Sequence, residues 1–208
     1  MRIIAGTLKG RRLSAPTWDG LRPTSDKLRE TLFNIIAGQM DGAQVLDGYA
    51  GTGAVGLEAL SRGARHVTFV ERDARAVRLI AENVKRCGVT SGYSIVRADA
   101  WAFTDGAGRD KRTARVEAIE GTQADAGGFD LIFLDPPYED ADVHRVWPSL
   151  AQRLTPDGLL VLEHATRRPP ETRDDIPAWR TVKAGDSSLT FYRRPATPES
   201  TAPPMTAP

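Results

Sequence analysis

The alternation of short apolar runs with helical stretches constrains the fold more than any other feature of this chain. Between residues 44 and 162, apolar runs of strand length recur, and a helical pattern follows each of the first two. Such alternation is typical of a parallel sheet that binds ligands at the carboxyl ends of its strands. The runs fall at 44–46, 66–70, 93–97, 129–134 and 159–162, and the helices at 55–62, 74–86 and about 142–154.

The two ends of the chain predict elements beyond the parallel sheet. Two runs, 179–183 and 189–193, flank Gly185-Asp186 and predict a closing antiparallel hairpin. We therefore expect an α/β protein with one core: a Rossmann-like doubly wound sheet, mostly parallel with a C-terminal antiparallel hairpin. We place a small basic N-terminal extension at 1–24, the α/β domain at 25–194 with a flexible insertion at 104–128, and a disordered tail at 195–208.

A helix is expected directly after the extension. Thr24 or Ser25 can cap this helix, and Gly38 or Gly42 can end it. Four apolar residues recur at helical spacing and predict one buried stripe, namely Leu28, Leu32, Ile35 and Ile36.

A glycine-rich turn after the first strand predicts a nucleoside ligand. Gly51, Gly53 and Gly56 match G-x-G-x-x-G between a strand and a helix, so backbone N–H groups can approach the ligand. Glu71 lies 20 positions after Gly51, where an acid can hold both hydroxyls of a ribose. Asp47 would repel a pyrophosphate but suits the ammonium of a methionine moiety. Adenosine plus a cationic amino acid describes S-adenosylmethionine (AdoMet).

The third strand adds candidate contacts to the adenine ring. Asp99 can accept a hydrogen bond from the adenine amino group, while the Ala100 N–H donates to a ring nitrogen. Arg72 is a candidate for flanking the adenosine. The predicted cofactor-binding set is Asp47, Gly48, Ala50, Gly51, Gly53, Glu71, Arg72, Asp99 and Ala100.

The run Asp135-Pro136-Pro137-Tyr138, at the end of the fourth strand, predicts the catalytic site. The two prolines stiffen the turn and leave nearby carbonyls free to accept hydrogen bonds. Asp135 adds a carboxylate, and Tyr138 adds a flat face for stacking. Together these groups suit a planar base with an exocyclic amino group.

These motifs, in this order, resemble those of AdoMet-dependent amino-methyltransferases. The amino-terminal residues narrow the resemblance to the small-subunit rRNA methyltransferase D family, a bacterial family that methylates N2 of a guanine in 16S rRNA. The resemblance covers about residues 1–192. The residues that carry it are Met1-Arg2-Ile3-Ile4-Ala5-Gly6, Gly10-Arg11-Arg12-Leu13, Arg22-Pro23-Thr24 and Thr31-Leu32-Phe33-Asn34-Ile35.

The resemblance implies that Arg22 and Thr24 line the entrance where AdoMet and RNA meet. The charge distribution also favours RNA, because residues 1–29 contain seven bases and two acids, whereas the remainder is acidic. The predicted RNA-binding set is Arg2, Lys9, Arg11, Arg12, Arg22 and Thr24.

Composition excludes several other classes of protein. The only cysteine is Cys87 and the three histidines are far apart, so we expect no disulfide and no metal site. The sequence shows neither a membrane-spanning run nor a signal-peptide pattern. We therefore expect a cytoplasmic protein, and a monomer. The resemblance implies that its partner is 16S rRNA or an assembling small ribosomal subunit.

The predicted reaction is direct in-line methyl transfer from AdoMet, with Asp135 and the Pro136 carbonyl orienting the guanine amino group. Asp135 or a water would take the proton. Three alternatives stay open at the level of sequence. Adenine N6 in DNA or RNA offers the same exocyclic amine. The glycine turn also suits a nicotinamide-dependent oxidoreductase. A ribosome-assembly module could keep the fold without the chemistry.

Overall fold

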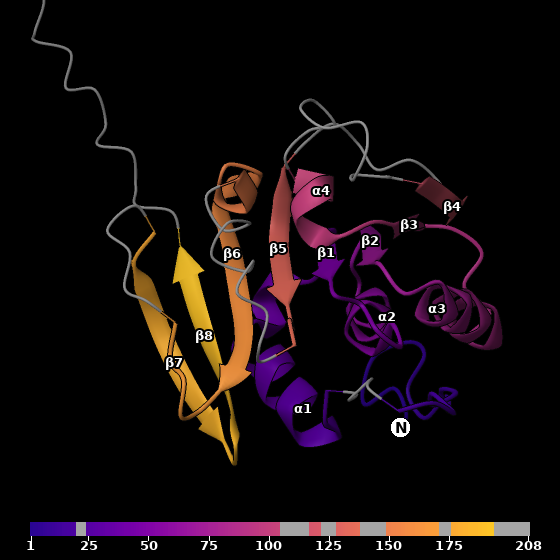
Figure 1. The fold of residues 1–208 in the computed structure, drawn as a ribbon, viewed down its shortest axis with the longest axis horizontal. Helices are drawn as coiled ribbons and strands as arrows, with labels where there is room; N and C mark the ends of the chain where they lie inside the picture. The colour runs from indigo at the N-terminus through magenta and orange to yellow at the C-terminus, as the bar shows by residue number, and fades with distance from the viewer. Residues whose placement is uncertain (20–23, 105–116, 122–127, 138–148, 171–175, 194–208) are drawn as a thin grey trace, which may run out of the picture.

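A computed structural model describes residues 1–19, 24–104, 117–121, 128–137, 149–170 and 176–193 (Figure 1). Its eight strands form one sheet in the order β4-β3-β2-β1-β5-β6-β8-β7. The strands are β1 (Gln44–Gly48), β2 (His66–Glu71), β3 (Tyr93–Arg97), β4 (Glu117–Gly121), β5 (Phe129–Leu134), β6 (Leu154–Ala165), β7 (Ala178–Ala184) and β8 (Ser187–Arg193). The helices are α1 (Asp26–Ile35), α2 (Ala54–Ser61), α3 (Ala74–Arg86) and α4 (Ala100–Thr104), and η1 (Ala37–Gln39) is a 3-10 turn.

The central part of the sheet is parallel, as the sequence predicted. Strand β1 pairs in parallel with β2 on one side and with β5 on the other, and β2–β3 and β5–β6 are parallel too. Strands β7 and β8 form the expected antiparallel hairpin, and β8 joins it to β6. The Rossmann-like fold class is thereby confirmed, and the strand order reverses between β1 and β5, where such sheets bind ligands.

Each face of the sheet carries its own hydrophobic core. Leu131 and Phe133 of β5 belong to the core that also contains residues of α1, α2 and α3. Ile132 and Leu134 of the same strand belong to the core on the other face, with Leu150 of the helical turn 149–151. This alternation follows from the two-residue period of a strand, and burial on both faces explains the continuous apolar run. No described helix is long and apolar enough to cross a membrane.

Helix α1 begins as predicted but ends earlier than predicted. Ser25 is the N-cap, and its hydroxyl accepts a hydrogen bond from the Leu28 N–H at 3.2 Å. The helix ends at Ile35, and Gly38 lies within the 3-10 turn that follows. Neither Gly38 nor Gly42 therefore ends the helix, because a tighter turn has already broken the α-helical ladder.

Two other segments also differ from expectation. The predicted flexible insertion at 104–128 contains a strand, β4, which pairs antiparallel with β3. Leu154, expected at the end of a helix, begins β6 and pairs with Phe129. In both cases, pairing with a distant strand overrides weak local signals. Residues 105–116, 122–127, 138–148 and the tail at 195–208 lie outside the described residues.

The N-terminal arm, residues 1–19, packs against α2 and α3. Within the arm, Arg2 and Arg12 form an isolated antiparallel β-bridge. The Glu58 carboxylate of α2 accepts hydrogen bonds from the Ile4 and Ala5 N–H groups at 2.7 and 3.0 Å. Gly6 is required at its position, because a Cβ there would lie 1.7 Å from the Ser61 carbonyl oxygen. The arm is therefore a fixed part of the domain surface beside the glycine turn.

Candidate methyl-transfer site

The glycine turn between β1 and α2 has the backbone conformation that its sequence predicts. Gly51 and Gly53 have φ values of 56° and 74°, which favour glycine. Tyr49 also has a positive φ, 64°, and is the only such non-glycine residue in the described part of the chain. Gly56 allows α2 to approach the sheet, because a Cβ there would lie 2.3 Å from the Phe69 ring. The turn is thus tightly folded at the carboxyl end of β1, where the Gly53 N–H donates to the Ala50 carbonyl at 2.7 Å.

Asp47 is fully buried beneath this turn. Its carboxylate accepts a hydrogen bond from the Gly56 N–H at 2.9 Å. Burial raises the pKa of Asp47 to about 8, the Gly56 hydrogen bond opposes that rise, and the nearby Asp135 and Glu71 carboxylates add to it. A cation placed between these acids would favour the ionised form, so the site suits an ammonium group.

Glu71, at the end of β2, is buried and fixed by two backbone groups. Its two carboxylate oxygens accept from the Gly51 N–H at 3.0 Å and from the Asp73 N–H at 2.8 Å. A carboxylate offers about four acceptor positions, so the orientation is set while acceptor capacity remains for ligand hydroxyls.

The predicted adenine contacts lie beside Glu71. An ion pair at 3.6 Å joins the Arg72 guanidinium to the Asp99 carboxylate, and both side chains are solvent-accessible. Ala100 follows Asp99 as the first residue of α4 and is buried. Asp99 and Ala100 are thus near the β2 end of the site, next to the predicted ribose ligand Glu71.

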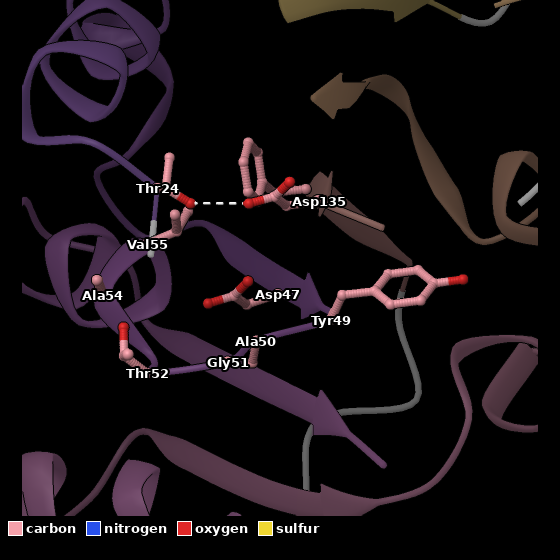
Figure 2. A pocket seen from close by; sticks show the side chains of 10 residues that line it. Thr24, Asp47, Tyr49, Ala50, Gly51, Thr52, Ala54, Val55 and Asp135 are labelled. Atoms are coloured by element: carbon pink, nitrogen blue, oxygen red, sulfur yellow. Dashed lines mark hydrogen bonds between the residues drawn. The ribbon is translucent and has the colours of Figure 1, made fainter. Parts of the chain in front are cut away.

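Asp135 lies at the carboxyl end of β5, next to β1. The Thr24 hydroxyl donates a hydrogen bond to its Oδ2 at 3.1 Å, although the two residues are 111 positions apart (Figure 2). Thr24 and Asp135 line a small pocket with Asp47 and the glycine turn, and Tyr49 extends away from Asp47 (Figure 2). Pro136 is buried and Pro137 is exposed, while Tyr138 lies outside the described residues. The sequence offered Thr24 as one of two possible helix caps, but its hydroxyl instead holds the predicted catalytic acid, Asp135.

A larger cavity of about 390 Å³ adjoins this pocket. Gly51, Glu71 and Arg72 of the predicted cofactor set line it, and so do Asp135, Pro136 and Pro137 of the predicted catalytic set. Tyr49, Gly51 and Asp135 line both the small pocket and the cavity. The cofactor motif and the catalytic motif therefore open into one continuous space.

Several residues of this cavity were not anticipated from the sequence. They are Trp18 and Asp19 of the N-terminal arm, Tyr49, Asp73, Arg75, Glu163 at the end of β6, and Ala184, Asp186 and Ser187 at the tip of the β7–β8 hairpin. Only Glu163 had a usable signal, because it ends an apolar strand as Asp47, Glu71 and Asp135 do. Tyr49, Asp73 and Arg75 lie close to predicted residues in the sequence, whereas long-range packing brings the residues of the N-terminal arm and of the hairpin tip to the cavity.

The predicted RNA-binding residues divide into two groups. Arg2, Lys9, Arg11 and Arg12 are exposed on the N-terminal arm, and Arg22 lies outside the described residues. Arg29 was counted in the basic amino end, but its side chain is fully buried. Arg29 donates to the Arg2 carbonyl at 2.8 Å and to Asp26 at 2.7 Å, with Glu58 at 3.5 Å. Arg29 therefore serves the fold and cannot contact RNA.

No group of three or more His, Cys, Asp or Glu side chains within the described ranges could hold a metal ion. The polar side chains among the residues that line the small pocket are those of Thr24, Asp47, Tyr49, Thr52 and Asp135.

Comparison with known proteins agrees with this geometry. The family model described as "Conserved hypothetical protein 95" matches residues 1–193. The chain is 33% identical over 208 residues to Ribosomal RNA small subunit methyltransferase D of Escherichia coli K12, covering 97% of this chain and 94% of that protein. The protein of the same name from Haemophilus influenzae is 30% identical over 195 residues, covering 93% and 92%. A solved structure of a hypothetical protein from Thermus thermophilus has a TM-score of 0.72 at 29% identity and covers 93% and 99%. The chain therefore belongs to the Conserved hypothetical protein 95 family, together with the small-subunit rRNA methyltransferases D, and is an AdoMet-dependent methyltransferase.

Proposed function

We propose that this enzyme methylates the exocyclic N2 of a guanine in 16S rRNA. The observation that carries the proposal is the single cavity lined by both Glu71 of the cofactor motif and Asp135-Pro136-Pro137. A methyl donor and an exocyclic amine must meet within one such space, because direct transfer requires the reacting atoms in near contact. The names of the relatives, small-subunit rRNA methyltransferases, support rRNA as the substrate.

The residues of the predicted cofactor set fit the two ends of AdoMet. Glu71 retains acceptor capacity for the ribose hydroxyls, and Arg72, Asp99 and Ala100 lie next to it for the adenosine. Asp47 is buried among negative charges, an arrangement that suits the methionine ammonium. Ala50 and Gly51 line the small pocket, and Gly48 and Gly53 flank them in the turn as the remaining proposed contacts. When bound, AdoMet supplies an electrophilic methyl group.

The catalytic residues would orient the amino group and stabilise its developing charge. The lone pair of the guanine N2 is delocalised into the ring, so the amine is a weak nucleophile. Asp135 and the Pro136 carbonyl accept the two N2–H groups and direct the lone pair toward the cofactor end of the cavity. Thr24 keeps one Asp135 oxygen in place. Pro137 stiffens the turn, and Tyr138 stacks on the flipped base.

The exposed bases of the N-terminal arm would contact the RNA backbone. Arg2, Lys9, Arg11 and Arg12 project from a segment that Glu58 and Ser61 hold against α2. Phosphate contacts of this kind give affinity that falls with salt and position the RNA without reading its bases. Arg22 and Thr24 complete the proposed RNA-binding set.

The proposal is tested by transfer of labelled methyl from AdoMet to 16S rRNA and to small subunits that lack the modification. Nucleoside analysis by mass spectrometry should detect N2-methylguanosine. Recovery of N6-methyladenosine would instead assign the enzyme to adenine. Absence of transfer to either substrate, with AdoMet binding confirmed, would overturn rRNA as the target.

The Asp135→Ala variant tests the assignment of the catalytic acid. We expect methylation to fall below detection while the AdoMet dissociation constant changes little, because the proposed cofactor contacts lie on β1, β2 and the β3–α4 connection. Calorimetric titration with AdoMet checks the binding. Full activity of Asp135→Ala would refute the assignment.

A further inference from the structure

Glu163 lies beside the proposed catalytic acid because of the register of the sheet. Leu134 of β5 and Leu162 of β6 are parallel partners, so the residues that follow them, Asp135 and Glu163, are neighbours at the same edge. Leu134 and Leu162 both belong to one core, so the next residue on each strand is directed to the opposite face, which Thr24 approaches. Both acids line the large cavity together with Pro136 and Pro137.

Glu163 differs from the other acids of the cavity in combining burial with a position next to Asp135. Glu163 is only 5% exposed, whereas Asp186 at the hairpin tip is exposed. Glu71 is also buried, but its position at the end of β2 is three strands away across β1 and β5. A hydrogen bond made by a buried carboxylate is strengthened by its low-dielectric surroundings, whereas water competes at an exposed one. Glu163 is therefore the acid best able to discriminate between bases on the target side.

We infer that Glu163 accepts a hydrogen bond from N1–H of the target guanine and thereby selects guanine over adenine. The inference rests on the proposed function. A flipped base is read through its Watson–Crick edge, where guanine presents N1–H directly beside the N2 amine. With Asp135 accepting from the amine, a second carboxylate from the adjacent strand suits the neighbouring N1–H.

Adenine offers the opposite chemistry at this position. Its N1 carries a lone pair and no hydrogen, so a carboxylate facing it would place two acceptors together and leave both unsatisfied. A site built to receive an N–H group rejects an analogue that lacks the group far better than an apolar pocket rejects an added methylene. Asp135 alone accepts from either exocyclic amine, so Glu163 supplies the discrimination that the Asp-Pro-Pro-Tyr motif lacks.

The test measures two enzymes on substrates that carry either of two target bases. Wild type and Glu163→Gln would each be assayed on a ligated 16S rRNA fragment with guanine or 2-aminopurine at the mapped target nucleotide. 2-Aminopurine keeps the N2 amine but has no N1–H. Wild type should prefer guanine by about 100-fold or more in kcat/KM, since losing one buried hydrogen bond to a charged group has about this effect. In Glu163→Gln the amide oxygen still accepts from N1–H but lacks the charge, so kcat/KM for guanine should fall about tenfold. The new amide N–H can donate to N1 of 2-aminopurine, so the activity on that base should hold or rise and the preference for guanine should fall to about 10-fold or less.

Controls separate recognition from folding. Asp157→Asn removes an exposed acid of the same strand outside the cavity and should leave both substrates unchanged. The AdoMet dissociation constant and the melting temperature of Glu163→Gln should match wild type. If Glu163→Gln does not fold, Glu163→Asp replaces it, because a shortened carboxylate should also weaken the preference for guanine.

The outcomes distinguish this inference from the proposed function. A guanine preference that the Glu163 variant leaves unchanged would overturn the inference, and so would no detectable methylation of 2-aminopurine by either enzyme. A wild type that forms no N2-methylguanosine in the guanine fragment or in small subunits reconstituted with that RNA would refute the proposed function itself.

Discussion

Replacing Asp47 with asparagine removes the ionisable group that burial perturbs most clearly in the site. The pKa of Asp47 rises from 3.8 to about 8 in the folded protein, so between those pH values the folded state binds a proton that the unfolded state does not. The contribution of Asp47 to stability is complete below about pH 4 and is lost as pH rises toward 8. At about 1.36 kcal/mol per pH unit, wild type should lose about 4 kcal/mol relative to Asp47→Asn between pH 5 and pH 8.

The assay is thermal or urea unfolding of both proteins without AdoMet, at half-unit steps from pH 5 to pH 8.5. The difference in unfolding free energy should increase in favour of Asp47→Asn and level off above about pH 8. For a domain of this size, about 4 kcal/mol corresponds to a shift in melting temperature of roughly 10 °C. Other titrating groups are common to both proteins, so the comparison isolates Asp47.

A difference between wild type and Asp47→Asn that stays constant from pH 5 to pH 8 would refute this reasoning. The matched control is Asp41→Asn, which removes an exposed acid. Saturating AdoMet provides a second check. If the methionine ammonium lies near Asp47, it favours the carboxylate, so the pH-dependent difference between the two proteins should shrink.

Two further substitutions test local geometry. Gly56→Ala should destabilise the fold by about 2 kcal/mol through overpacking, because the new methyl would lie 2.3 Å from the Phe69 ring and 2.7 Å from Val67. Urea unfolding measures this loss. The control Gly38→Ala, which has open space around its new methyl, should change the unfolding free energy by less than about 0.5 kcal/mol. Thr24→Val should lower the methylation rate constant about tenfold with unchanged AdoMet affinity, because Asp135 loses the hydroxyl that holds it. Thr24→Ser should retain most of the rate in single-turnover assays, and a similar loss in both variants would argue against the positioning role.

The N-terminal arm shows how the fold and the site depend on each other. The Asn83 side chain of α3 donates to the carbonyls of Ser14 in the arm and Thr52 in the glycine turn, at 3.2 and 3.0 Å. Glu58 joins the arm to α2, and Arg29 joins it to α1. The exposed bases of the arm are thus fixed relative to the cofactor turn, which suits a surface that positions a large RNA.

The sequence predicted those features that local chemistry specifies. The bounds of α3, residues 74–86, were predicted without error, because Asp73 caps the start and Gly88 takes a positive φ of 69° just after the end. The glycine turn, the parallel strands and the β7–β8 hairpin were predicted from periodicity and turn residues. Each of these features depends on residues that are close together in the sequence, so a single segment is enough to predict it.

Tertiary structure decided which side chains meet. The register of β5 and β6 places Glu163 next to Asp135, and the path of the chain before α1 brings Thr24 to the same acid. Folding buries Arg29 and Asp47, and this burial raises the pKa of Asp47, with a smaller contribution from the nearby Asp135 and Glu71 carboxylates. Strand order, register and burial depend on contacts between segments far apart in sequence, so no local pattern could specify them.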